Sequence, residues 1–483
     1  MGCGAAACRE ARAPMTGRHS KNISGNGELH CTEELFVIPE GEKYLLYAPF
    51  EKALLLVNGS AVRFLQRVRA GAVAPGEVEP EVVKDFEDAN ILKCRPADAK
   101  SGKPFEVDAA FDPGGVTLIT TNGCSMRCIY CYAKGGDNAR SMSWATARAA
   151  VDWMIGHARK TGKPGFNLQF HGGSQLQDMR GLMKRCVEYA RQRGGTYDLA
   201  VRIEAGLNGV LDASLADWVT ENLDGATLSL DGIARVQNAQ RPLANGGDSF
   251  DVVSACLRRL DAKGFAYGIR ATVTRESLGM LADSIEYMCK HFDAKTIQVE
   301  PVFAAGRAQA NNLGAIDPEC FVERYRTARE IAGSYGKELK YSGARFGTLT
   351  NIFCNAVGKS FVVTAEGQLT SCYEVTDPED PRSSLFLFGG LDQRSGRFVF
   401  DDDRIRRLRS LSVENKPYCE KCFCKWHCAG DCAAKLAMLG DAWDPSRSAR
   451  CHINRELTKD QMKEYLQRLD QNDQKGKNHE RQG

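Results

Sequence analysis

Hydrophobic and polar positions between residues 116 and 335 repeat one pattern six times: a short apolar run, then a longer stretch with apolar positions at helical spacing. The apolar runs predict buried strands, and the helical spacing predicts amphipathic helices. The predicted strands are Val116–Thr121, Phe166–His171, Leu199–Glu204, Ala226–Leu230, Tyr267–Val273 and Thr296–Pro301. The predicted helices lie near 143–160, 178–193, 213–223, 249–263, 278–291 and 318–335, with Ser143, Asp178, Asp212, Ser249 and Asp317 as expected N-caps. Six such units in series predict an α/β fold in which a parallel sheet curves into a partial (β/α)6 barrel, with ligands at the carboxyl ends of the strands.

A smaller unit is predicted ahead of the barrel. Three strands are expected at Leu35–Ile38, Lys43–Ala48 and Ala53–Val57, and two helices at Ser60–Arg69 and Glu81–Ala89. We therefore expect a small domain at residues 30–100 and the barrel at residues 110–340. Residues 1–29 lack periodicity, which is typical of disorder, and residues 456–483 are expected to form a helix and a polar tail.

Composition narrows the class of protein. The chain has 483 residues, a formal net charge of +3 and 19 cysteines. The nearly balanced charge argues against a nucleic-acid partner. The sequence shows no secretory segment and no apolar run long enough to span a bilayer, so we expect a cytoplasmic protein with no membrane partner. In such a chain, a high cysteine content indicates metal binding rather than disulfides.

Three cysteines lie in one short loop directly after the first predicted strand. Cys124, Cys128 and Cys131 have the spacing Cys-x3-Cys-x2-Cys. Three thiolates can hold three irons of a [4Fe–4S] cube and leave the fourth iron open. A structural zinc ion normally requires four ligands, and this loop has no fourth cysteine or histidine. The loop therefore predicts an iron–sulfur site with one open position.

This spacing resembles the signature of radical S-adenosylmethionine (SAM) enzymes. The resemblance implies that SAM binds the open iron and is cleaved to a 5′-deoxyadenosyl radical, with the three cysteines as catalytic ligands. It also implies SAM contacts from Tyr130, Gly172, Gly173, Ser174, Gln175, Asn208, Ser229 and Arg241. Gln175 stands where the family usually has a glutamate, so a neutral amide replaces a charged acceptor for the SAM ammonium. The neighbouring His171 is expected to be a packed histidine.

A second set of cysteines occupies the C-terminal third: Cys354, Cys372, Cys419, Cys422, Cys428, Cys432 and Cys451. Their spacing resembles the seven-cysteine SPASM extension of radical SAM enzymes, which implies a domain at residues 341–455. By this resemblance the first auxiliary [4Fe–4S] cluster is held by Cys354, Cys372 and Cys432. The second is held by Cys419, Cys422, Cys428 and Cys451. Zinc ribbons are the alternative, with Cys419 and Cys422 as one half-site.

The first auxiliary site lacks a fourth cysteine nearby, because residues 341–353 contain none. An open iron there would bind a substrate thiolate and favour a thioether product. Alternatively Cys424, Cys320 or an oxygen ligand closes the site, and carbon–carbon or carbon–oxygen crosslinks become equally expected. Glu374, two residues after Cys372, is the predicted substrate base.

Together these resemblances imply a radical SAM/SPASM peptide maturase with SAM and three [4Fe–4S] clusters. The expected partners are a ribosomal precursor peptide and an electron donor such as flavodoxin or ferredoxin. The N-terminal domain resembles the winged-helix, PqqD-like module that adds a leader peptide to its sheet, with a plain extension of the barrel as the alternative. A sulfatase maturase that makes formylglycine, and a non-catalytic iron–sulfur or zinc scaffold, remain open.

Overall fold

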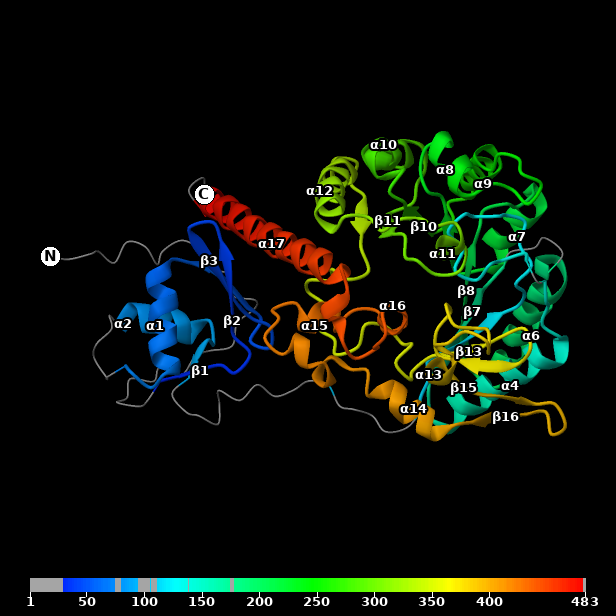
Figure 1. The fold of residues 1–483 in the computed structure, drawn as a ribbon, viewed down its shortest axis with the longest axis horizontal. Coiled ribbons are helices and arrows are strands. Elements are labelled where there is room, and N and C mark those ends of the chain that lie inside the picture. Colours follow the sequence, from blue (N-terminus) through cyan, green and yellow to red (C-terminus); the bar gives the residue numbers. More distant parts are fainter. Residues whose placement is uncertain are drawn as a thin grey trace.

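The computed structural model describes residues 29–73, 80–93, 105, 111–137, 139–173 and 178–480. They form a mixed α/β fold around one large sheet, with a smaller sheet near the N-terminus (Figure 1). Ser174 and Gln175 lie outside the described residues, as do residues 1–28.

The large sheet has eleven strands in the order β12-β11-β10-β9-β8-β7-β6-β13-β14-β15-β16. Its parallel part contains the six predicted strands: β6 (Gly115–Ile119), β7 (Gly165–His171), β8 (Ala200–Leu207), β9 (Gly225–Ser229), β10 (Tyr267–Val273) and β11 (Thr296–Pro301). The bounds of β10 and β11 match the prediction residue for residue, and the six strands lie side by side in sequence order. Within the described ranges no further strand pairs with β12 or β16, so the two ends of the sheet do not meet.

The predicted helices between these strands are confirmed. They are α4 (Trp144–Lys160), α6 (Lys184–Gly195), α7 (Ala213–Asn222), α9 (Phe250–Ala262), α10 (Leu281–His291) and α12 (Pro318–Ser334). The π-helix η2 (Met179–Met183) precedes α6, and the 3-10 helix η3 (Leu278–Met280) precedes α10. Two helices that were not predicted are α8 (Ala234–Gln240) and α11 (Arg307–Ala310). Ser143, Asp212 and Asp317 cap their helices through side-chain hydrogen bonds, as predicted. Asp178 and Ser249 occupy the N-cap positions of η2 and α9, but neither side chain makes a capping hydrogen bond. Asp178 already has helical backbone angles, and the Ser249 hydroxyl accepts from Gln237 instead.

The C-terminal segment extends the same sheet at both ends. β12 (Glu338–Lys340) pairs with β11, and β13 (Phe361–Val363) pairs in parallel with β6. β14 (Gln368–Thr370), β15 (Leu387–Asp392) and β16 (Arg397–Phe400) follow as antiparallel strands. β15 and β16 form a hairpin, and the short helix α13 (Ser383–Phe386) leads into it.

The rest of the C-terminal segment is helical or irregular. It contains α14 (Asp402–Arg409), α15 (Lys425–Cys428), α16 (Ala433–Met438), α17 (Arg450–Glu480) and the 3-10 turns Val413–Asn415, Pro417–Cys419 and Pro445–Arg447. α17 continues through most of the expected polar tail, whose Gln, Lys and Glu residues are good helix formers. None of the helices in the described ranges combines the length and apolar character needed to cross a bilayer.

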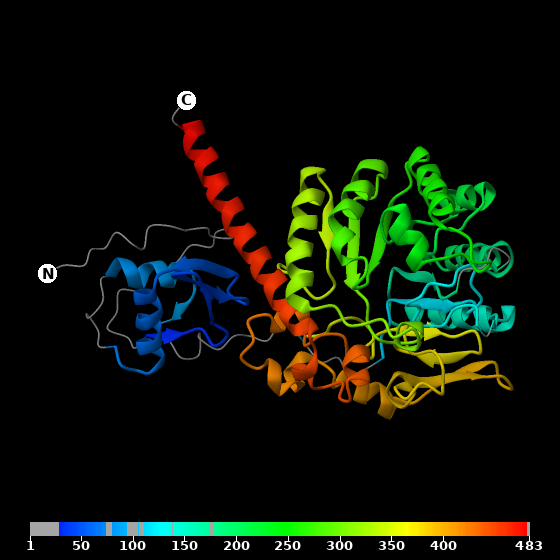
Figure 2. The same ribbon diagram turned by 45° about the horizontal axis from the view of Figure 1, so that its top comes forward.

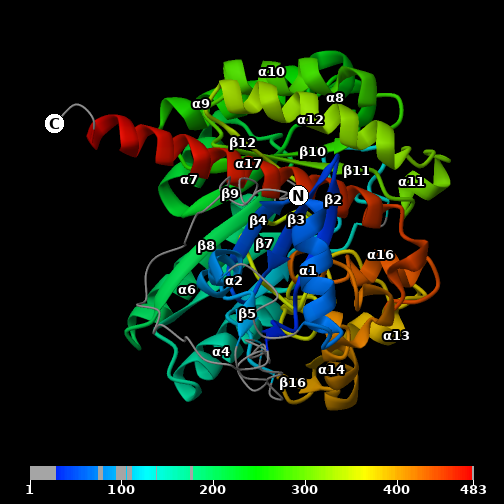
Figure 3. The same cartoon turned by 90° about the vertical axis from the view of Figure 1, so that its left-hand side faces the viewer.

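The N-terminal unit has its own sheet of β2 (Phe36–Glu40), β3 (Lys43–Ala48) and β4 (Ala53–Val57), with α1 (Gly59–Arg69), α2 (Pro80–Asp88) and the short pair β1 (His30–Cys31) and β5 (Leu92–Lys93). Alternate residues of β3 face opposite sides, because a strand has a side-chain period of two. Leu46 packs on the side of α1, and Leu45 packs against the C-terminal segment. Figure 1 shows this unit at one end of the molecule and the large sheet at the other. Figures 2 and 3 show α17, in red, beginning in the C-terminal segment and running past the N-terminal unit.

A buried arginine joins the large sheet to the turns that carry two of the C-terminal cysteines. Arg450, next to Cys451, donates to Asp431 at 3.0 Å and to Glu300 in β11 at 3.3 Å. Asp431 precedes Cys432 in the chain. Burial alone would raise the carboxyl pKa values, but the Arg450 charge holds the pKa of Asp431 and that of Glu300 below their usual range. Arg450 is thus the leading counter-charge of both carboxylates, and Arg270 adds to it at Glu300.

Replacing Arg450 should destabilise the fold strongly. Arg450→Met removes the ion pairs of two buried carboxylates with Arg450, and breaking a buried pair in this way costs about 3–5 kcal/mol. Chemical denaturation monitored by circular dichroism should show that loss in the apparent free energy of unfolding. Arg447→Met, on the exposed side of the same turn, is the control and should change it by no more than about 0.5 kcal/mol. Equal effects of the two changes would contradict the structural role of Arg450.

Candidate active site

The first cysteine loop lies at the carboxyl end of β6. Burial, opposed by the charge of Arg241, raises the pKa of Cys128 to about 11, and the thiolates of Cys131 and Cys124 add to the effect. The backbone N–H of Gly135 donates to the Cys131 sulfur at 3.4 Å, and the Asn208 amide lies 3.7 Å from the Cys124 sulfur. The three thiols therefore share one site, which a cation or metal cluster would keep ionised.

Tyr130 and Arg241 hold this loop from one side. The Tyr130 hydroxyl donates to Asp231 at 2.6 Å, and Arg241 donates to Tyr130 at 2.8 Å and lies 3.6 Å from the Met126 sulfur. Arg241 is only 6% exposed, and its Nε has no hydrogen-bond partner among the described residues. These contacts give both residues a place in positioning the loop, and their predicted contact with SAM stays a prediction.

Gly172 and Gly173 bring the loop after β7 against the cysteine loop. A Cβ atom on residue 173 would lie 2.0 Å from the carbonyl oxygen of Gly123, and one on residue 172 would lie 2.8 Å from that of Thr121. Gly172 also has a φ of 114°, which favours glycine. The close approach of two backbones explains both glycines, and direct contact with SAM remains to be tested.

The other predicted SAM contacts occupy neighbouring strand ends. Asn208 follows β8, and its amide donates to the Ser125 hydroxyl at 3.0 Å. Ser229 is the last residue of β9 and is partly buried. The described members of the predicted set thus lie at or beyond the carboxyl ends of β6, β7, β8 and β9. This is the edge at which parallel sheets bind ligands.

The thiols of the predicted first auxiliary site lie near one another. Cys354 lies at the exposed side of this group, where desolvation by the surrounding protein, followed by the charge of Cys432, raises its pKa. Burial, the charge of Glu374 and the thiolates of Cys432 and Cys354 also raise the pKa of Cys372. The structure thus brings together three cysteines that are far apart in sequence.

The thiols of the predicted second auxiliary site form a separate group. Burial raises the pKa of Cys451 most. The charge of Asp431 and the thiolates of Cys428, Cys419 and Cys422 raise it further. Cys424 is also buried, and its thiol donates to the carbonyl oxygen of Asn454 at 3.4 Å. The neighbouring Cys424 thiol lowers the pKa of Cys428, so Cys424 lies with the second group of thiols.

A left-handed turn separates the two groups. Ala429, Gly430 and Asp431 have φ angles of 49°, 72° and 67°. In a continuous helix, Cys428 and Cys432 would share one face. The turn instead directs them to different groups, at a cost of about 1–2 kcal/mol for each non-glycine residue in this conformation. The hydrogen bonds from Arg450 and Ser448 to the Asp431 carboxylate hold it in place.

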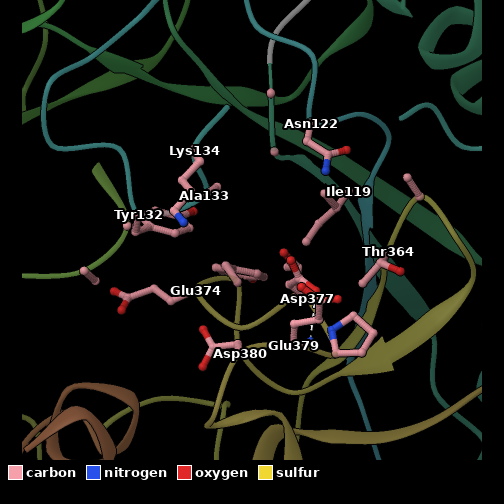
Figure 4. A pocket seen from close by; sticks show the side chains of 18 of the residues that line it. Ile119, Asn122, Tyr132, Ala133, Lys134, Thr364, Glu374, Asp377, Glu379 and Asp380 are labelled. Carbon is pink, nitrogen blue, oxygen red and sulfur yellow. Dashed lines mark hydrogen bonds between the residues drawn. The ribbon is translucent and has the colours of Figure 1, made fainter. Parts of the chain in front are cut away.

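A cavity of about 540 Å³ lies between the first cysteine loop and the segment after Cys372. Figure 4 shows Tyr132 and Lys134 on the side of the cysteine loop, and Glu374, Asp377, Glu379 and Asp380 on the other side. Glu374 accepts from Lys435 at 2.8 Å and lies 3.7 Å from Arg382. Burial alone would raise the pKa of Glu374, but these two cations hold it below its usual range. Glu374 is thus an ionised carboxylate at the cavity wall.

His171 is a cavity residue that the sequence interpretation treated only as a packed histidine. Its Nε2 lies 2.8 Å from the Tyr132 hydroxyl, and its ring centre lies 4.7 Å from that of Tyr373. Burial, followed by the charge of Arg270, lowers the pKa of His171 to about 4, so the imidazole is neutral. Tyr132 directly follows Cys131 and Tyr373 directly follows Cys372, so His171 connects the two cysteine segments. In the sequence, the signal that His171 could line a binding site was its position at the end of a predicted parallel strand.

In the ranges that the structure describes, no three Cys, His, Asp or Glu side chains converge on a single metal position. One zinc ion requires all its ligands within about 2.0–2.3 Å of a common point, whereas a four-iron cube binds each thiolate at a different corner.

No family model matches the chain. It is 21% identical over 330 residues to a cysteine-type anaerobic sulfatase-maturating enzyme of Clostridium perfringens, covering 65% of this chain and 86% of that protein. It is 25% identical over 183 residues to an uncharacterized protein of Methanocaldococcus jannaschii, covering 38% of this chain and 60% of that protein. The second match therefore spans less than two thirds of the relative's length.

Solved structures share the fold. The structure of anSMEcpe with bound AdoMet matches with a TM-score of 0.59 and 15% identity, covering 74% of this chain and 99% of that one. SuiB of Streptococcus suis bound to the precursor peptide SuiA matches with a TM-score of 0.50 and 12% identity, covering 87% and 99%. The resemblance to SPASM-type radical SAM enzymes that the cysteine spacing predicted is thereby confirmed.

The contact between the two loops can be tested at Gly173. Gly173→Ala forces a Cβ atom onto the Gly123 carbonyl, and overpacking of this kind costs about 1–3 kcal/mol. Gly156→Ala in α4 is the matched control, since a Cβ there meets nothing within 4 Å and should stabilise the helix by about 0.5–1 kcal/mol. Thermal denaturation of the two variants gives the comparison. A Gly173→Ala protein as stable as the wild type would show that the loops do not pack as described.

Proposed function

We propose that the chain is a radical SAM maturase that oxidatively modifies a peptide, and in particular a ribosomally made precursor. The observation that supports this most is the cavity, whose wall joins the residues after Cys131 to the residues after Cys372. A substrate held there would lie between a site of radical formation and a site able to accept an electron.

The donor set of the first loop fits a [4Fe–4S] cluster with one open iron. Cys124, Cys128 and Cys131 supply soft ligands, and N–H groups of Gly135 and Asn208 are directed at two of the sulfurs. When bound, the cluster and SAM would supply the radical that removes a hydrogen atom from the substrate. We propose one further cluster for each of the two C-terminal cysteine groups, three in all, reduced by a flavodoxin or ferredoxin.

The chain itself positions the substrate and receives its proton. The Tyr132–His171 hydrogen bond and the Glu374–Lys435 ion pair fix polar groups at the cavity wall. Ionised Glu374 is our candidate for the proton acceptor. The exposed carboxylates of Asp377 and Glu379 at the cavity would disfavour acidic residues beside the modified position, because like charges repel.

The N-terminal sheet is proposed to recognise the precursor by strand addition. Both of its faces are covered, by α1 on one side and by the C-terminal segment on the other. Among the described residues no further strand pairs with β2 or β4, and β2 carries Pro39, which cannot donate a ladder hydrogen bond. An extended leader would therefore pair best with β4. The structure of SuiB with the precursor SuiA shows that a protein of this fold binds a precursor.

Sulfatase maturation is the second candidate, favoured by the sequence match that covers 86% of the Clostridium perfringens enzyme. The two functions differ in their product. Mass spectrometry after anaerobic incubation of the chain with a cysteine-containing sulfatase peptide should reveal formylglycine if the second candidate is right. A crosslink formed in a precursor encoded near the chain's gene would favour the first.

The bond formed depends on the first auxiliary site. Three cysteine ligands would leave one iron for a substrate thiolate, whose pKa the metal would lower and whose sulfur would then lie beside the carbon radical. A thioether is the product that this arrangement favours. A fourth protein ligand at that site would make carbon–carbon and carbon–oxygen crosslinks equally expected.

Metal analysis tests the cofactors. Anaerobically reconstituted protein should contain about twelve irons, four for each cluster. Replacing Cys124, Cys128 and Cys131 together with alanine should remove about four of them and abolish SAM cleavage, measured as 5′-deoxyadenosine by liquid chromatography. Cys289→Ala, which changes a buried core thiol outside all three cysteine groups, is the control and should keep both the iron content and SAM cleavage. Stoichiometric zinc with little iron would refute the proposal.

Gln175 gives a second test. If it contacts the SAM ammonium, Gln175→Glu should tighten SAM binding or leave it unchanged, because a charge-assisted bond replaces a neutral one. Isothermal titration with SAM measures the change, with Gln177→Glu as the control. A large loss of affinity in Gln175→Glu alone would show that this residue has another role.

A further inference from the structure

The N-terminal sheet packs against the loop of the second auxiliary site. Side chains from β2, β3 and β4 form one buried cluster with that loop and with α17: Ile38, Leu45, Tyr47, Leu54, Phe423, Cys424, Cys428 and Met462. Cys428 is 6% exposed and Cys424 is completely buried in this arrangement. The face of the sheet opposite α1 therefore packs on this cysteine loop and shields it from solvent.

A buried hydrogen bond lies within this contact. The Nδ1 of His427 lies 3.1 Å from the carbonyl oxygen of Thr348, which can only accept, so Nδ1 carries the proton. The Nε2 is then an acceptor, and the Tyr47 hydroxyl donates to it at 2.7 Å. His427 is 0% and Tyr47 4% exposed, so water does not replace this bond.

Further polar contacts hold the edge of the interface between the N-terminal unit and this cysteine loop. Lys425 donates to Glu34 at 2.7 Å, and the Trp426 indole donates to the same carboxylate at 3.2 Å. Arg345 donates to the carbonyl of His427 at 2.8 Å, so the residue next to Cys428 is held through both its backbone and its ring. Outer groups of this kind orient metal ligands and control solvent access to them.

We infer that the N-terminal sheet forms the wall of the second auxiliary site, and that Tyr47 is a positioning residue that fixes His427 and, through it, Cys428. This inference rests on the proposed function, since it assumes a cluster at that site. The domain proposed to recognise the leader thus also shields a metal centre. Hydrogen bonding and solvent exposure at the sulfurs set the stability and potential of such a cluster. A change at the N-terminal sheet should therefore be detectable at the cluster.

Two matched pairs of variants on β3 test the inference, because alternate residues face opposite sides. Tyr47→Phe removes the bond to His427, and Leu45→Ala opens the wall. Tyr44→Phe and Leu46→Ala make the same chemical changes on the side of α1. In the reconstituted full chain, the first pair should alter the electron paramagnetic resonance signal and midpoint potential of one cluster. Iron loss in air should become several-fold faster and should involve about four irons per chain.

The controls should leave the spectrum, the potential and the rate of iron loss unchanged, even though Leu46→Ala lowers stability as much as Leu45→Ala. Thermal denaturation of all four variants separates loss of stability from an effect on the site. Identical spectra, potentials and iron-loss rates for Tyr47→Phe and Tyr44→Phe would overturn the inference. An iron content of about twelve in the unmodified chain would still support the proposed function in that case, so the two failures are distinguishable.

Discussion

The pairing of buried Arg450 with Glu300 and Asp431 is the constraint on which the rest of the C-terminal half depends. An unpaired buried charge is costly, so these three residues must stay together. One carboxylate belongs to β11, the other closes the left-handed turn before Cys432, and the arginine precedes Cys451. A single ionic contact therefore places both C-terminal cysteine groups relative to the large sheet.

The cavity follows from that placement. The segment after Cys372 reaches the carboxyl edge of the sheet because β13 pairs with β6, the strand that leads into the first cysteine loop. Tyr132 and Tyr373 then both contact His171. The residues that follow two cysteine sites far apart in sequence thus line one cavity, which suits the proposed reaction.

The N-terminal unit is part of the same arrangement rather than an appendage. Its sheet has one face on α1 and the other on the second cysteine loop, which leaves its edges available for a partner strand. A peptide that pairs with such an edge would lie close to residues that pack on Cys428. Recognition and protection of the metal site would then use a single small sheet.

The sequence by itself determined the strand–helix order, the bounds of β10, β11, β3 and β4, and the resemblance carried by the cysteine spacing. These features depend on neighbours in the chain, because hydrophobic period and motif spacing are local. Only the tertiary structure decided that β13 joins β6, that His171 lines a cavity, and that Tyr47 meets His427 across 380 residues. Asp178 shows the same limit on a smaller scale, since this suitable capping residue has helical backbone angles and its side chain makes no capping hydrogen bond. Strand pairing and burial are settled by contacts between distant segments, and no local pattern records which segments will meet.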